Sequence, residues 1–175
     1  MKGIIIYQGK YGATAQYAAW LGEALHLPVA DIDHPSVGNL VEYGYIIAGS
    51  PVYMGKLLIK DWLCDNEQML LNRKLLLFIV SSAFPDDKAR QGIVLKNNLP
   101  ETLANTATVF FLRGRVVINK LSWRDKLTVR IGAMMEKDPE KKALMRRGFD
   151  DVKRENIAPL IKTAQHFLYT DVKCI

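Results

Sequence analysis

Cysteine is scarce in this chain, which has two among its 175 residues, Cys64 and Cys174. They lie far apart and outside any spacing typical of metal ligands, so the sequence predicts neither a zinc site nor a disulfide. We expect two thiols that pack or face solvent in a reducing compartment. No metal site is predicted.

Long hydrophobic runs are also missing. The most apolar stretch, residues 75–80, is far below the ~20 residues that a membrane-spanning helix needs. The apolar run at residues 3–7 is too short for a signal peptide. Two locations stay open on these grounds: the cytoplasm, and the inner face of the membrane with the protein bound peripherally to its surface.

Several catalytic and binding motifs are absent. The chain has no Gly-x-Ser-x-Gly sequence for a serine hydrolase and no Gly-Lys-Ser/Thr for a P-loop, and its three histidines are scattered. It also lacks the interleaved aromatic platform of single-strand nucleic-acid binders. We therefore predict no catalytic side chain and no nucleic-acid partner.

Strand-like and helix-like segments alternate along the chain. Short apolar runs predict strands, and apolar residues at three- to four-residue spacing predict helices. This order predicts a single α/β domain over residues 1–175, with a doubly wound, five-stranded parallel sheet of order 2-1-3-4-5 and helices on both faces. The predicted strands are 3–7, 29–32, 43–49, 75–80 and 108–118, and the predicted helices are 15–25, 59–71, 89–103 and 150–169.

Residues 119–149 do not fit this frame and are predicted to form an extra helical segment after the fifth strand. The segment is basic, because residues 113–154 hold 13 Lys/Arg and 6 Asp/Glu in a chain of net charge +6. A basic segment on a nearly neutral body favours an anionic partner.

The first predicted strand runs through a glycine loop into a helix. Backbone N–H groups at a helix start are unpaired and the helix dipole adds positive charge, so such a loop suits a phosphate. A tight turn capped by Thr14 explains the same residues equally well. The glycine spacing does not match the dinucleotide fingerprint and suits a mononucleotide better. The loop consists of Gln8, Gly9, Lys10, Tyr11, Gly12, Ala13 and Thr14.

Residues 5–7 followed by residues 10–14 resemble the phosphate loop of the flavodoxin-domain family. The subgroup they resemble contains menaquinone-dependent protoporphyrinogen oxidases and small uncharacterised flavodoxins, and the likeness covers nearly the whole chain. It implies a flavodoxin-like fold, FMN as the cofactor and electron transfer. That subgroup usually has Ser or Thr at the position of Gly9, so here backbone amides and Thr14 would have to hold the phosphate.

Two further loops complete the predicted FMN crevice. The loop after the third strand resembles the family's flavin-wrapping loop: Tyr53 and Met54 offer faces for stacking, and Gly49 and Gly55 allow close approach. A surface turn shaped by Pro51 and Tyr53 is the alternative. The loop after the fourth strand takes the place of the second ring loop, although Ser-rich turns are common after strands. The predicted ring-binding residues are Ser50, Pro51, Val52, Tyr53, Met54 and Gly55, then Ser81, Ser82, Ala83 and Phe84.

Residues 122–137 combine an apolar stripe with a basic border. Three interpretations stay open: the stripe packs against the sheet as core, it lies on an anionic membrane, or it walls the flavin and meets a partner. In the protoporphyrinogen oxidase subgroup a comparable insertion is thought to contact substrate or membrane. The stripe consists of Trp123, Leu127, Ile131, Met134 and Met135.

We predict an FMN-binding, flavodoxin-type protein that transfers electrons through the bound flavin. Its partner is predicted to be a redox protein or an anionic small molecule. Two alternatives stay open: a quinone-linked dehydrogenase similar to protoporphyrinogen oxidase, and a flavodoxin-fold interaction module without FMN.

Overall fold

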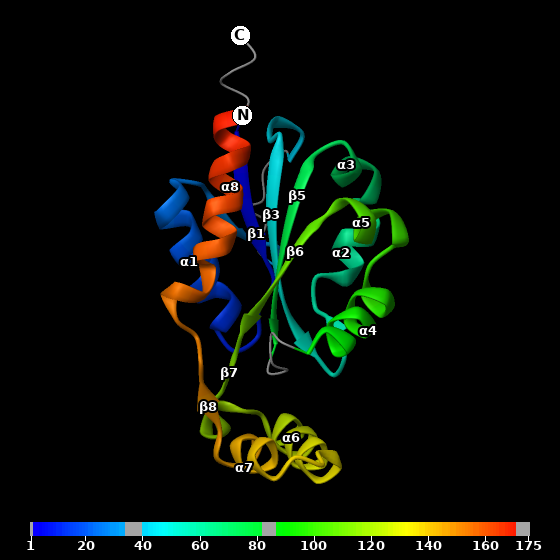
Figure 1. Ribbon diagram of the computed structural model, residues 1–175, viewed down its shortest axis with the longest axis vertical. Helices are drawn as coiled ribbons and strands as arrows, with labels where there is room; N and C mark the ends of the chain where they lie inside the picture. Colours follow the sequence, from blue (N-terminus) through cyan, green and yellow to red (C-terminus); the bar gives the residue numbers. More distant parts are fainter. Residues whose placement is uncertain (1, 34–39, 82–86, 171–175) are drawn as a thin grey trace.

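A sheet of five parallel strands forms the centre of the molecule (Figure 1). The computed structural model describes residues 2–33, 40–81 and 87–170. The strand order β2-β1-β3-β5-β6 corresponds to the predicted order 2-1-3-4-5, so the predicted fold class is confirmed. The strands are β1 (Gly3–Tyr7), β2 (Val29–Asp31), β3 (Tyr45–Tyr53), β5 (Lys74–Ser81) and β6 (Thr108–Arg113).

Helices cover both faces of this sheet, as Figure 1 shows. The strands are apolar on both sides: in β1, Ile5 packs into one buried cluster while Ile4 and Ile6 pack into the other. Such strands, buried on both faces, are typical of parallel sheets. One face carries α1 (Ala13–Leu25) and α8 (Ala158–Thr170), and the other carries α2 (Lys60–Asp65), α3 (Glu67–Leu71), α4 (Lys88–Asn98) and α5 (Glu101–Thr106).

Gly49 lies in β3 where the ring of Phe78 crosses the strand. A Cβ on Gly49 would lie 2.0 Å from that ring, so the glycine is required by core packing. The expectation that Gly49 allows close approach of a flavin is therefore wrong, because Phe78 occupies the space.

The third strand is longer than predicted and turns into a hairpin. It continues through Pro51 to Tyr53 and pairs antiparallel with β4 (Lys56–Leu57). The neighbouring strand β1 ends opposite Gly49, so Pro51 lies where β3 has become an edge on that side, a place that tolerates proline.

Other predicted boundaries shift for local reasons. The helix predicted over residues 59–71 is divided at Asn66, and the one over residues 89–103 is divided ahead of Pro100. The closing helix begins at Ala158, after the 3-10 turn η3 (Arg154–Ile157), rather than at Asp150. Pro159 thus lies in the first turn of α8, where its missing N–H costs no hydrogen bond. A 3-10 turn, η1 (Leu40–Glu42), precedes β3.

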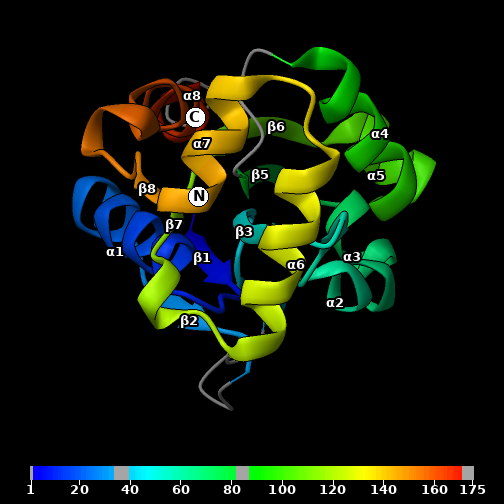
Figure 2. The same ribbon diagram turned by 90° about the horizontal axis from the view of Figure 1, so that it is seen from below.

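The inserted segment is a helical hairpin below the carboxyl ends of the strands, and α6 runs across this edge in Figure 2. The strand predicted over residues 108–118 breaks at Gly114, and β7 (Arg115–Val116) pairs with β8 (Phe149–Asp150) at the hairpin's base. At the far end of α6, Glu136 pairs with Arg90 of α4, with 3.5 Å between Arg90 Nη2 and Glu136 Oε2. The hairpin consists of η2 (Ile118–Lys120), α6 (Trp123–Met135) and α7 (Pro139–Arg147).

No helix in the described parts of the chain is long and apolar enough to cross a membrane.

Candidate functional site

A cleft of about 280 Å³ lies between the carboxyl edge of the sheet and the inserted hairpin. It brings together parts of all three predicted loops, although they are distant in sequence. In doubly wound folds, ligands bind at the carboxyl ends of the parallel strands, beside the point where the strand order reverses. The predicted residues that line the cleft are Lys10, Tyr11, Ala13, Thr14, Pro51, Val52, Tyr53, Met54 and Ser81.

Other predicted site residues lie beside the cleft rather than on its wall. The Gln8 side chain donates to Asp33. Ser50 is buried, and its hydroxyl donates to the Pro51 carbonyl and accepts from the Ile59 N–H. Gly9, Gly12 and Gly55 shape the two loops without lining the cleft. Ser82, Ala83 and Phe84 lie outside the described residues.

The loop after β1, which was predicted to hold a phosphate, ends at an uncapped helix start. Gly12 is the N-cap of α1 with φ +82°, a left-handed conformation that favours glycine. Within the described residues, no side chain caps this helix start and its first turn holds no acidic residue. The first N–H groups of α1 therefore remain available to an anion.

The loop after β3, residues 50–55, is the predicted ring loop; it forms a tight hairpin that α4 supports. Met54 and Gly55 form its turn with φ values of +50° and +78°. The buried side chain of Asn98, in α4, accepts from the Leu57 N–H at 2.9 Å and donates to the Gly55 carbonyl at 2.9 Å. These bonds fix the turn that presents Tyr53 and Met54 to the cleft.

The inserted hairpin supplies the remaining wall of the cleft, as one of the three interpretations of residues 122–137 held, but through residues that the sequence interpretation did not name. The residues of α6 that face the cleft recur at helical spacing, opposite the apolar stripe, and that periodicity was the available signal. The wall residues that were not predicted are Val80, Gly114, Arg115, Val116, Leu121, Asp125, Thr128, Val129, Gly132 and Met145.

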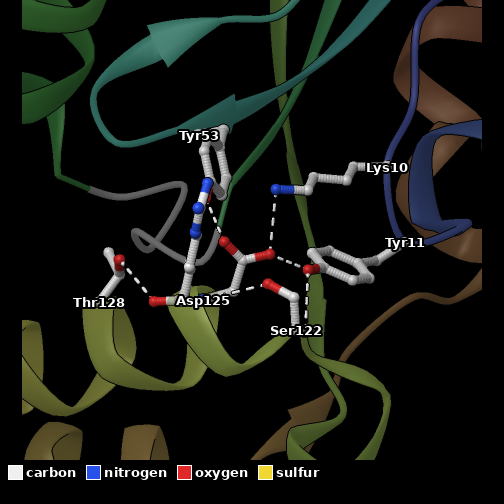
Figure 3. Close-up of polar contacts among 7 residues, drawn as sticks. Lys10, Tyr11, Tyr53, Ser122, Asp125 and Thr128 are labelled. Atoms are coloured by element: carbon white, nitrogen blue, oxygen red, sulfur yellow. Dashed lines mark hydrogen bonds and ion pairs between the residues drawn. The ribbon is translucent and has the colours of Figure 1, made fainter.

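Asp125 joins the hairpin to the loop after β1 and to the loop after β3 (Figure 3). The phenols of Tyr11 and Tyr53 donate to its two carboxylate oxygens, and Lys10 Nζ lies 3.0 Å from Oδ2. Burial lowers the pKa of Lys10, but hydrogen bonds to Asp125 and Tyr53 outweigh it and hold this pKa above its ordinary value. The ammonium also lies 3.8 Å from the centre of the Tyr53 ring, a cation–π distance.

The outer face of α6 is apolar and exposed. Trp123 and Met134 are each 71% exposed, and Leu127 and Ile131 are each 50% exposed. The interpretation of this stripe as core is therefore wrong. The stripe faces outward because Asp125, Thr128, Val129 and Gly132 occupy the inward face of the same helix.

The geometry suits an anion next to a flat aromatic group. Free helix N–H groups recognise a phosphate, and Tyr53 with the apolar side chains Pro51, Val52 and Met54 offers faces to a planar ring. In the described part of the chain, no group of three or more His, Cys, Asp or Glu side chains could hold a metal ion.

Comparison with known proteins finds a family model and a set of similar solved structures. A family model described as a flavodoxin domain matches residues 4–143. No curated protein matches the chain. Similar solved structures include flavodoxin 1 from Bacillus cereus, which is 20% identical over 65% of this chain and 84% of that one, with a TM-score of 0.48. A flavodoxin from the domain Archaea is 16% identical over 93% and 99% of the chains, with a TM-score of 0.45. A flavoprotein in complex with FMN from Lactobacillus acidophilus NCFM is 16% identical over 64% and 91%, with a TM-score of 0.45.

Proposed function

The chain belongs to the flavodoxin-domain family, and we propose that its cleft binds FMN and that the protein transfers electrons through this flavin. The observation that carries the proposal is the uncapped start of α1 facing a cleft walled by Tyr53. A phosphate and a planar ring would each find a partner in this one cleft.

The residues present fit this cofactor. The backbone N–H groups of residues 10–14, with the hydroxyl of Thr14, would hold the phosphate. Tyr53 and Met54 would flank the ring, and Ser81 would approach it from the end of β5. Bound FMN supplies reversible one- and two-electron transfer, while the protein sets its orientation and its access to solvent.

A direct titration tests the proposal. We expect the purified protein to be yellow and to release FMN on denaturation. We also expect the protein freed of cofactor to quench FMN fluorescence to a saturating end point. A protein that stays colourless after FMN is added would contradict the proposal and favour a flavodoxin-fold interaction module instead.

A quinone-linked dehydrogenase similar to protoporphyrinogen oxidase is the second candidate. The observation that favours it is the exposed apolar stripe of α6, bordered by the exposed cations Arg124, Arg130 and Lys137. Such a face fits peripheral contact with an anionic membrane, where an isoprenoid quinone resides. The same helix walls the cleft on its other side.

Reduction assays separate the two roles. The dehydrogenase predicts flavin reduction by protoporphyrinogen and reoxidation by menaquinone. No reduction by this substrate, beside fast reduction by a ferredoxin or a flavodoxin reductase, would favour the electron carrier.

A further inference from the structure

Asp125 brings a buried carboxylate from the inserted hairpin into the cleft (Figure 3). The residue is 3% exposed. Burying a carboxylate is costly unless partners compensate it. Here the phenols of Tyr11 and Tyr53 and the ammonium of Lys10 all reach its oxygens. The carboxylate is thus held between the phosphate loop and the ring loop.

This carboxylate is not used to cap its own helix. In a capping box the third helical residue accepts from the N-cap N–H. Here the Ser122 N–H donates to the Tyr11 hydroxyl at 3.4 Å, and Ser122 Oγ accepts from the Asp125 N–H at 3.2 Å. The helix keeps its cap while the Asp125 carboxylate points into the cleft.

Among the partners of Asp125, Lys10 is the one whose charge bears on phosphate binding. It belongs to the phosphate loop, and its side chain remains 39% exposed while it pairs with Asp125. The ammonium that would attract a phosphate is therefore balanced by an anion of the same chain.

We propose that Asp125 is a built-in counter-anion that lowers the preference of the cleft for FMN over riboflavin. It does so by neutralising Lys10 and by placing a negative charge in the cleft that receives the phosphate. The inference rests on the proposed function, because it concerns the flavin that the cleft would bind. It makes Asp125 a specificity-determining residue supplied by the insertion.

Comparing the affinities for FMN and riboflavin separates the effect of charge from effects of packing. FMN carries a dianionic phosphate that riboflavin lacks, while both have the same ring and ribityl chain. Loosening of α6 or a change in ring packing alters both affinities alike. A change of one unit of charge in the cleft alters the affinity for FMN alone.

The experiment measures dissociation constants for FMN and riboflavin by fluorescence quenching. It uses the wild-type protein, Asp125→Asn, Lys10→Gln and a control, Asp65→Asn. Asp65 is an exposed carboxylate at the end of α2, so the control makes the same chemical change on another element. The ratio of the riboflavin constant to the FMN constant should rise about tenfold in Asp125→Asn, or ~1.4 kcal/mol. It should fall in Lys10→Gln and stay unchanged in the control.

Each outcome decides. An unchanged ratio in Asp125→Asn, with both flavins weakened alike, would show that Asp125 only anchors the hairpin and would overturn the inference. If Asp125→Asn does not fold, Lys10→Gln still tests the inference from the other side of the ion pair, because an unchanged ratio there shows that this pair does not set the flavin preference and overturns the inference. A wild-type protein that binds neither flavin would overturn the proposed function itself.

Discussion

Gly9 lies next to the start of α1, in a position that has room for a side chain. A Cβ at this position would lie 3.6 Å from the Thr14 Cβ and 3.8 Å from the Ala15 nitrogen, which are ordinary contacts. Gly9 is not among the residues with positive φ, so a side chain would cause no backbone strain. This glycine is therefore not required by the fold, in contrast to Gly49.

Gly9→Ser should tighten FMN binding. The new hydroxyl would add one hydrogen bond to a charged phosphate, which is worth ~1.5 kcal/mol, or about a tenfold lower dissociation constant. Riboflavin binding should not change, because riboflavin has no phosphate. Fluorescence titration of both flavins measures the effect.

Gly9→Ala is the matched control, since it fills the same space without a hydroxyl. An equal gain in Gly9→Ala and Gly9→Ser would show that a stiffer loop, rather than a new donor, tightens binding.

At the residue scale, the sequence predicted those site residues that follow directly from a strand end. Lys10, Thr14 and Tyr53 line the cleft because loops after parallel strands converge on one edge. Asp125 could not be predicted, because its contacts depend on how the insertion packs across that edge. Gly49 was misinterpreted because the sequence does not show what fills the space beside a glycine. Here a core ring, that of Phe78, fills it rather than a ligand.

At the element scale, the position of the ring loop depends on a helix that contributes nothing else to the cleft. Asn98 is 1% exposed and bonds to the turn of the β3–β4 hairpin at Gly55 and to β4 at Leu57. It also donates to the Val94 carbonyl at 2.8 Å. A short two-residue strand such as β4 needs such support, because an isolated hairpin is marginally stable.

Asn98→Ala should destabilise the protein and weaken flavin binding together. It leaves the buried Leu57 N–H without its partner and removes the bond to the part-buried Gly55 carbonyl, at a cost of ~1–3 kcal/mol in the free energy of unfolding. Urea denaturation measures the stability, and FMN titration measures the affinity at a temperature where the variant is folded. Asn97→Ala is the control, because the neighbouring Asn97 side chain is exposed. A loss of stability without a loss of FMN affinity would show that Asn98 supports α4 rather than the ring loop.

Elements were predicted well where periodicity decides and poorly where tertiary contacts decide. The continuous apolar run of β5 identified a central strand, since both its faces are buried. The break at Gly114 follows from the pairing of β7 with β8. No local sequence pattern predicts a pair of two-residue strands. The late start of α8 likewise follows from η3. In this turn the Asn156 side-chain amide donates to the Tyr17 hydroxyl at 2.7 Å.

At the scale of the whole molecule, charge and exposed apolar surface gather on the inserted hairpin. Residues 113–154 hold 13 Lys/Arg and 6 Asp/Glu, against a net charge of +6 for the chain. The apolar stripe of α6 lies within this basic region, on the hairpin below the sheet (Figure 1). A basic helix with an exposed apolar face is the arrangement expected for binding at an anionic membrane surface.

The protein should therefore sediment with vesicles of phosphatidylglycerol and phosphatidylcholine, and much less with phosphatidylcholine alone. Raised salt should weaken this binding, because the electrostatic part is screened. Trp123→Ser should lower the partition coefficient at least about tenfold, because burying one large apolar side chain is worth ~1.5–3 kcal/mol. Ile93→Ser is the control, since Ile93 is 60% exposed but belongs to α4 rather than to the hairpin. Equal losses in the two variants would mean that apolar exposure in general governs the adsorption. A wild-type protein that stays in solution with both kinds of vesicle would contradict membrane contact, and the stripe would then remain as a surface for a protein partner.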